Sequence, residues 1–244
     1  MRILGIVALC AALGGCASPE TIGFRASNPQ QQTMMRDGQP ALVSRQKSSL
    51  VLVRPAARKL QARGRPIFVV GINNLSGQPI DFRVDQVEAI QHVGETDYVM
   101  QVVTFDKLVD EERNRQIAAA ILTGVAAVGN AASASQAGRG TYTTPSGKTG
   151  TFYSPTANAI AQNNAAVQNE VMISATIETG QRNMAALEQS VIKDNTLMPG
   201  EWYGGQLHLA PPTDKGGAQK TYTLIITVGG DRHVVEIAQG PVSP

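Results

Sequence analysis

The sequence predicts an α+β protein, in which an immunoglobulin-like antiparallel β-sandwich is interrupted by a long alanine-rich helical hairpin. Residues 48–104 and 196–240 alternate apolar and polar side chains or contain β-branched runs, as strands do. Residues 105–195 between them are rich in Ala, Ile, Leu, Glu, Arg and Gln, which favour helix. Four expected strands before the helices and three after them indicate one sandwich with an insertion.

The strands show clear patterns. Ile80, Phe82 and Val84 alternate with charged residues, which is typical of a half-buried strand. Trp202 begins another strand, directly after a Met-Pro-Gly-Glu turn. We expect the seven strands at residues 50–54, 66–73, 79–87, 98–104, 202–209, 221–228 and 233–238.

The first helix is expected from Asp106 to about residue 136, with Thr104 as its N-cap. Asp110, Glu111 and Glu112 lie near the positive end of its dipole. Consecutive helical residues point in different directions. These acids are therefore predicted to be a solvated capping cluster and not a catalytic pair.

The second helix is expected to begin at Pro155, with Ser154 as its N-cap, and to run to about residue 194. Gly180 is expected to bend or break it. Residues 138–154 form the loop of the hairpin, either as a small β-hairpin or as an ordered loop. Helices of about 45 and 60 Å exceed what a compact domain of this size needs, so a projecting hairpin is expected.

The hairpin carries unusually little charge. Between residues 117 and 177 the charged residues are Arg139, Lys148 and Glu170. Three interpretations remain open: an alanine-rich hairpin packed on itself and on the sandwich with uncharged polar residues outside, an assembly surface, or membrane insertion. Small residues at helical spacing let two backbones approach closely. The candidate contact residues on the first helix are Ala120, Gly124 and Val128.

The sequence contains no motif of a known catalytic or cofactor site. His92, His208 and His233 lack the spacing of a metal motif and are expected to be ordinary strand residues. No nucleophile elbow, phosphate loop or dinucleotide-binding glycine pattern is present. We therefore expect neither an enzyme nor a cofactor, a metal or a small-molecule substrate.

Trp202 and Tyr203 lie among three glycines and form the densest aromatic patch. One interpretation is a core tryptophan, with the glycines easing close packing. The other is a partner-binding strand edge, where aromatic side chains flank exposed backbone.

The N-terminus has the pattern of a secretion signal. Arg2 is followed by the apolar residues 3–13 and then by small residues. Leu13-Gly14-Gly15-Cys16 resembles the lipobox of bacterial lipoproteins. The resemblance implies removal of residues 1–15 and acylation of Cys16. Because Ala17 is not the aspartate typical of inner-membrane retention, it also implies the periplasmic leaflet of the outer membrane.

Residues 16–47 are polar and rich in Gln, Ser, Pro and Arg, so a flexible tether is expected there. Loss of residues 1–15 removes Arg2 and leaves 20 of the 21 basic residues against 19 acids, a net charge of about +1. That charge does not indicate nucleic-acid binding. Cys10 leaves with the signal, so the mature chain has no free thiol.

These features favour a structural or interaction lipoprotein, held to a membrane by lipid, whose helical hairpin serves self-assembly or contacts another envelope protein. Two alternatives remain open. One is a membrane-active lipoprotein, pore-forming or surface-inserting, that uses residues 117–177. The other is an accessory of an envelope transport system, which rests on the architectural similarity to adaptor proteins with a helical hairpin behind a lipid anchor.

Overall fold

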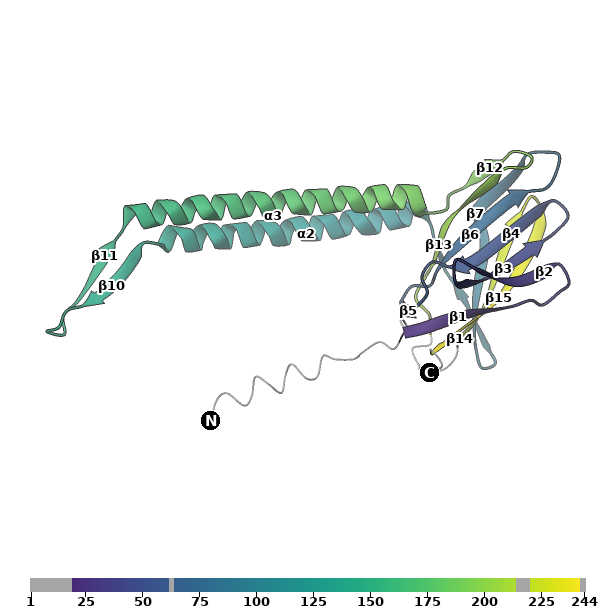
Figure 1. The fold of residues 1–244 in the computed structure, drawn as a ribbon, viewed down its shortest axis with the longest axis horizontal. Helices are drawn as coiled ribbons and strands as arrows, with labels where there is room; N and C mark the ends of the chain where they lie inside the picture. The colour runs from purple at the N-terminus through teal and green to yellow at the C-terminus, as the bar shows by residue number, and fades with distance from the viewer. Residues whose placement is uncertain (1–18, 62–63, 214–219, 242–244) are drawn as a thin grey trace. The chain divides into compact units, whose positions relative to one another are not determined.

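The computed structural model describes residues 19–61, 64–213 and 220–241 (Figure 1). The chain divides into two compact units, one made of residues up to Phe105 and from Ser190 on, the other of Asp106–Gln189. The first unit consists of strands in two sheets, and the second contains two long helices. The predicted α+β class is confirmed. The lipobox and Cys16 lie outside the described residues.

The larger sheet has seven strands in the order β12-β7-β14-β15-β1-β5, with β8 paired to β7. All of these pairings are antiparallel. The strands are β1 (Pro19–Arg25), β5 (Leu60–Gln61), β7 (Ile80–Val93), β8 (Thr96–Met100), β12 (Asn195–Leu197), β14 (Lys220–Val228) and β15 (Asp231–Pro241).

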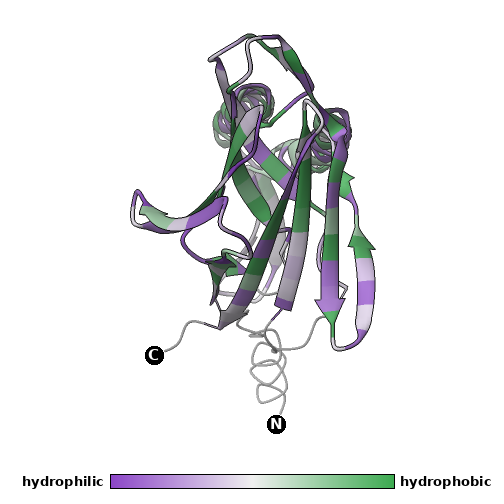
Figure 2. Ribbon diagram, turned by 90° about the vertical axis from the view of Figure 1, so that its right-hand side faces the viewer, coloured by the Kyte–Doolittle hydropathy of each residue, from purple (hydrophilic) through white to green (hydrophobic). Residues whose placement is uncertain are grey.

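The second sheet has six antiparallel strands in the order β2-β3-β4-β6-β13-β9. Apolar side chains from both sheets form one buried core, as in a sandwich. Figure 2 shows the hydrophobic residues along the strands in green. In β4, Val51 and Val53 are buried and their neighbours are half-buried, the expected period of two. The strands are β2 (Gln31–Arg36), β3 (Gln39–Arg45), β4 (Ser49–Pro55), β6 (Ile67–Asn74), β9 (Val102–Val103) and β13 (Trp202–Leu209).

All seven predicted strands are found, with the fourth divided between β8 and β9. The prediction of a flexible tether over residues 16–47 is wrong from Pro19 on, because β1, β2 and β3 lie there. Their polar composition hides the pattern. In β1 the buried positions are Glu20 and Ile22, and a buried glutamate does not register as an apolar position.

The second unit consists of α2 (Phe105–Gln136), β10 (Arg139–Thr143), β11 (Thr149–Tyr153) and α3 (Pro155–Ser190). The predicted helices and the β-hairpin between them are confirmed. The predicted break at Gly180 is wrong, because α3 continues through it. Gly180 is buried, and a Cβ there would lie 2.9 Å from the side chain of Gln116. This glycine permits close helix packing.

Candidate interaction surface of the helical hairpin

Polar and small side chains line the seam between α2 and α3. The hydroxyls of Thr123 and Thr176 lie 3.1 Å apart. Asn130 donates from Nδ2 to Oδ1 of Asn169 at 2.9 Å, and Asn169 donates to the carbonyl of Ala127 at 3.1 Å. These polar groups of the seam therefore satisfy one another's hydrogen bonds.

Glu112 lies at the α2–α3 seam near the start of α2. Its side chain is 3% exposed, and one carboxylate oxygen lies 2.6 Å from Nη1 of Arg115. Gln116 and Asn183 donate to the other oxygen at 3.2 and 3.0 Å. The prediction of a solvated acidic cluster is therefore wrong for Glu112, although Asp110 is exposed. Three donors compensate for the desolvation of this carboxylate.

At the other end of the hairpin, Asn158 is buried and caps α2. Its Nδ2 donates to the carbonyls of Ala134 and Ala137, each at 3.0 Å. The carbonyl of Ala134 also accepts from the N–H of Ala137 at 3.1 Å, and Asn158 supplies a further donor where the helix ends. Gly138 follows with φ of 81°, the left-handed conformation that ends many helices.

The outer side of the hairpin is apolar along α2. Within residues 117–132 the polar side chains are Thr123 and Asn130, and both belong to the seam. The outer side of α3 mixes isoleucine and valine with exposed Asn163, Asn164 and Glu170. The exposed apolar side chains, 45–71% accessible, are Ile117, Ile121, Leu122, Val125 and Val128 of α2 and Ile160, Val167, Val171, Ile173 and Ile177 of α3.

The three residues proposed from the sequence on α2 all lie on this exposed side. Val128 is 70% exposed, and Ala120 and Gly124 are also exposed. No heavy atom lies within 4 Å of the position that a Cβ of Gly124 would take. The interpretation in which uncharged polar residues form the outside is therefore wrong for α2. We call exposed residues 117–132 the outer face of α2.

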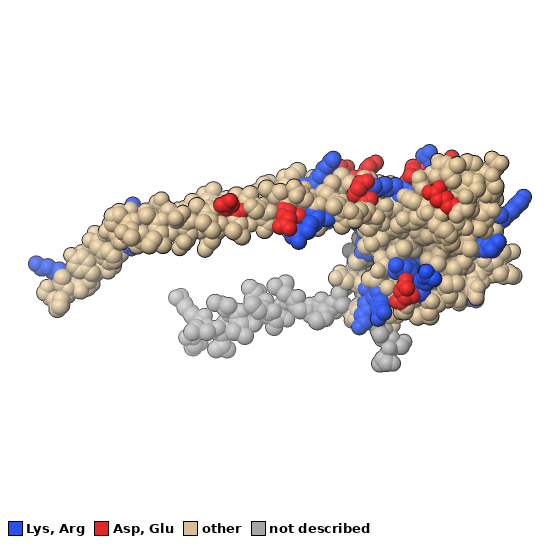
Figure 3. Space-filling model, turned by 45° about the horizontal axis from the view of Figure 1, so that its top comes forward, with Lys and Arg blue, Asp and Glu red and all other residues tan. Residues whose placement is uncertain are grey.

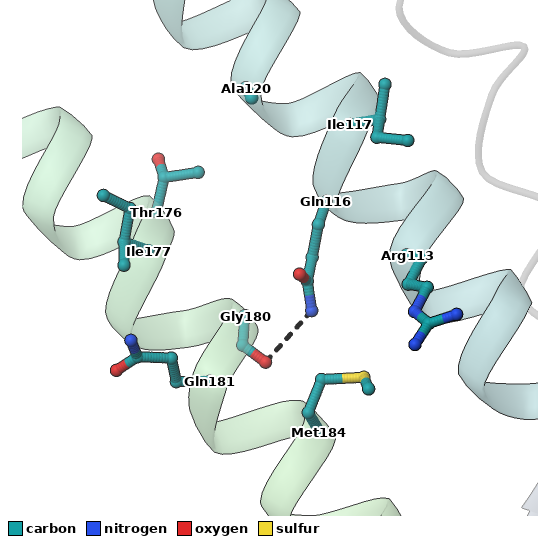
Figure 4. A pocket seen from close by; sticks show the side chains of 9 residues that line it. All are labelled: Arg113, Gln116, Ile117, Ala120, Thr176, Ile177, Gly180, Gln181 and Met184. Carbon is teal, nitrogen blue, oxygen red and sulfur yellow. Dashed lines mark hydrogen bonds between the residues drawn. The ribbon is translucent and has the colours of Figure 1, made fainter.

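An open groove of about 740 Å³ runs along one side of the hairpin near its base (Figure 4). Ile117 and Ala120 of α2 and Ile177 and Met184 of α3 line it. In Figure 4 the amide of Gln116 points across the groove floor, where it donates to the carbonyl of Gly180 at 3.1 Å. The groove extends the outer face of α2 towards α3.

The β10–β11 hairpin carries exposed aromatic rings. Tyr142, Phe152 and Tyr153 are 54%, 53% and 55% exposed. The rings of Phe152 and Tyr142 occupy the space in which Gly140 and Gly150 would otherwise carry a Cβ, at 2.5 and 2.6 Å. Each glycine thus allows an aromatic ring to lie across the neighbouring strand.

Trp202, in the aromatic patch of β13, is not a core residue. Trp202 is 60% exposed, and its ring carbon Cζ3 is 3.8 Å from the Cβ position of Gly71. Tyr203 is half-buried, and its hydroxyl bonds to both the N–H and the carbonyl of Lys193. The backbone at Trp202 pairs with Asn73 of β6. This pairing occupies one edge of the patch, so the exposed feature is the indole.

Two histidines belong to side-chain networks that the sequence does not reveal. His233 is fully buried, with Nε2 2.8 Å from Oγ of Ser49 and Nδ1 3.0 Å from Oγ of Ser44. Burial lowers the pKa of His233 to about 4, against an opposing effect of Asp231. His233 is therefore neutral at pH 7 and ties β15 to β3 and β4.

His92 lies between Asp97, 2.6 Å from Nδ1, and the hydroxyl of Thr223, 2.7 Å from Nε2. The order hydroxyl, imidazole and carboxylate resembles that of a hydrolytic triad. Thr223, however, lies within β14 and pairs with Ile90 and Glu236. Its backbone amide is committed to the sheet, so it cannot serve as an oxyanion donor.

The seam side of α2 does leave a signal in the sequence, but an unusual one. Glu112, Gln116, Ala119, Thr123 and Asn130 recur at spacings of three, four and seven, so they lie on one side of α2. A seam is usually sought as an apolar stripe. In this hairpin small and polar residues form the stripe at the seam, and the larger apolar residues of α2 lie outside it.

Among the helices in the described part of the chain, α2 alone is long and apolar enough to cross a membrane, and 6% of its most apolar stretch is buried. Within residues 19–61, 64–213 and 220–241, no group of three or more His, Cys, Asp or Glu side chains could hold a metal ion. Comparison with known proteins finds no family model, no curated protein and no solved structure that matches this chain.

Proposed function

We propose that this chain is a lipid-anchored envelope protein that assembles with copies of itself through the outer face of α2. One observation carries the proposal: apolar side chains cover that face, while the polar side chains within residues 117–132, Thr123 and Asn130, bond to α3 in the seam. Burial of each exposed Ile, Leu or Val stabilises a contact by about 1.5–3 kcal/mol. In a two-fold contact both copies contribute the same side chains.

A second copy of the chain fits this surface better than lipid does. Glu170, Asn163 and Asn164 are exposed on α3, and an unpaired carboxylate or amide in hydrocarbon is costly. If α2 faces another copy, α3 can remain in water. Anchoring to one bilayer also raises the effective concentration of copies.

The anchor is part of the proposal. Acylation of Cys16, with two or more chains, would hold the protein stably on a membrane. We place it on the periplasmic leaflet of the outer membrane, with an immunoglobulin-like sandwich interrupted by the hairpin. Mass spectrometry of the mature protein tests this directly. An N-terminal acylated cysteine is expected, and an unmodified Cys16 would contradict the proposal.

Self-assembly can be measured by sedimentation equilibrium of the acylated protein in density-matched detergent. We expect an oligomer for the wild type and a monomer for Val125→Glu, because Val125 is 67% exposed on the outer face and a charge there is desolvated by contact. Gln168→Glu is the matched control, since it adds the same charge to an exposed position of α3. A monomeric wild type, or an oligomeric Val125→Glu variant, would contradict assembly through α2.

A second candidate is membrane insertion of the hairpin. Residues 117–136 of α2 carry no charge, and 20 helical residues span about 30 Å, the thickness of a hydrocarbon core. Dye release from liposomes distinguishes this function. Leakage that rises with protein and is lost in Val125→Glu supports insertion. Intact liposomes at high protein loading count against it.

A further inference from the structure

In one long segment of the sandwich, every charged side chain is basic. Residues 38–80 contain no Asp or Glu. The near-neutral charge of the whole chain conceals this asymmetry. The basic residues of the segment are Arg45, Lys47, Arg54, Arg58, Lys59, Arg63 and Arg65.

Several of these residues meet at one end of the sandwich, which is also where β1 begins. β5 pairs with β1 in the register Pro19↔Gln61 and Glu20↔Leu60. Nη2 of Arg58 lies 3.1 Å from the Cβ position of Gly38, in the turn after β2. Figure 3 shows blue Lys and Arg atoms clustered on the lower side of the sandwich, with red Asp or Glu atoms among them. We define the basic end as Arg36, Arg54, Arg58 and Lys59.

The charge of the basic end is poorly compensated. Glu20 is buried and bonded to Lys220 at 2.8 Å, so it does not offset the surface charge, whereas Asp37 does. Glu95 and Asp97 lie at the β7–β8 turn, three strand spacings or about 14 Å from β1 in the sheet. That separation exceeds the screening length of about 8 Å at physiological salt.

We infer that the basic end docks on the anionic phospholipid headgroups of the bilayer that holds the acylated Cys16. The inference rests on the proposed lipid anchor. Pro19 follows Cys16 by three residues, and three residue steps reach at most about 11 Å. The anchor therefore brings the start of β1, and β5 beside it, to the headgroups.

The electrostatics favour a sandwich docked on the membrane over one that moves freely on its lipid anchor. Arg58 and Lys59 are exposed, and Arg54 is half-buried. Each Lys or Arg held at an anionic surface strengthens association about fivefold. A basic surface is one of the signals that strengthen membrane anchoring by acyl chains. The sandwich would then have a fixed orientation on the membrane.

The test uses the acylated protein reconstituted into vesicles of phosphatidylcholine alone or mixed with phosphatidylglycerol. A fluorophore is attached through Ala57→Cys, because Ala57 is exposed within the basic segment and the sequence has no cysteine besides Cys10 and Cys16. Quenching by aqueous iodide reports whether the basic end contacts the bilayer. Flotation of the same samples reports the lipid anchor separately.

We expect quenching to fall several-fold on the mixed vesicles and to recover in high salt. Arg58→Gln with Lys59→Gln should lower the ratio of docked to undocked protein about 30-fold. Arg45→Gln with Lys47→Gln removes equal charge from the opposite end of β3 and β4, so it should have no such effect.

Equal quenching on both vesicle types, in protein that floats, would overturn the docking and leave the anchor standing. An equal effect of the two double variants would also overturn it, by showing that net charge alone matters. Protein that does not float with either vesicle type would contradict the anchor and, with it, this inference.

Discussion

Asn130 and Asn169 hydrogen-bond to each other across the helical hairpin at 2.9 Å, while Val128, two residues from Asn130, is 70% exposed. A helical hairpin in water usually shows the reverse arrangement, with apolar residues inside and polar residues outside. Burial of the outer face of α2 is therefore the step that would contribute most hydrophobic stabilisation. This is the physical basis for assigning contact to that face.

Asn169→Leu should destabilise the hairpin. Asn169 accepts from Asn130 and donates to the carbonyl of Ala127, so the change leaves Asn130 without its acceptor. We expect a loss of about 1–3 kcal/mol in the free energy of local unfolding, measured by hydrogen exchange of the α2 and α3 amides. Asn164→Leu, at an exposed position, is the control and should change it by less than about 0.5 kcal/mol. Equal effects of the two variants would refute the role of the seam.

The sequence predicted the strands and helices well wherever apolar residues recur with a clear period. Ile80, Phe82 and Val84 show a period of two, and their strand was found. The prediction from the sequence failed where a buried position is polar. Glu20 in β1 and Glu112 in α2 are buried by partners far away in the sequence, Lys220 and Asn183.

The candidate surface was predicted only in part. The low charge of residues 117–177 indicated an unusual hairpin, and Val128 and Gly124 were singled out. Which side of α2 meets α3 could not be deduced, because Ala119 and Ala120 are chemically identical and only the structure shows which one faces the seam. The total charge of the chain does not predict the basic end, because acidic residues elsewhere balance the basic residues of 38–80.

Lys220→Met should strongly destabilise the sandwich. Nζ of Lys220 lies 2.8 Å from both carboxylate oxygens of Glu20, and Gln239 donates to the same carboxylate. Removal of the lysine leaves a buried charge, at a cost of about 3–5 kcal/mol. Urea denaturation measures the change.

The double variant Glu20→Met with Lys220→Met is the control, because it removes both charges. Of the three groups, only Gln239 then remains polar and must find a new partner. It should be clearly more stable than the single variant. If the double variant is as unstable as Lys220→Met, the loss comes from altered packing and not from an unpaired carboxylate.

His233 should make the sandwich sensitive to acid. Its pKa is lowered to about 4 by burial, whereas the unfolded chain has the ordinary value of about 6.5. The unfolded state therefore binds more protons between these values, and stability falls as pH decreases through this range. Between pH 7.5 and 4.5 the contribution is roughly 2–3 kcal/mol.

His233→Gln removes this titration. The urea midpoint of the variant should therefore depend less on pH than that of the wild type over the same range, whatever its stability at pH 7.5. Parallel pH profiles for the two proteins would show that the buried imidazole does not control acid sensitivity.

Disulfide trapping in native membranes tests assembly through α2 most directly. The mature chain is expected to carry no free thiol, since Cys10 leaves with the signal and Cys16 is acylated, so each introduced cysteine reports on its own site. Residues brought together by a contact can form a disulfide when their Cα atoms lie within about 7 Å. Single cysteines are placed on the outer face at Ile121, Val125 and Val128, and on α3 at the exposed controls Asn163, Asn164 and Gln168.

We predict disulfide-linked dimers from at least one outer-face position and none from the α3 controls. Monomers from all six variants, or dimers formed equally from both helices, would contradict assembly through the outer face of α2.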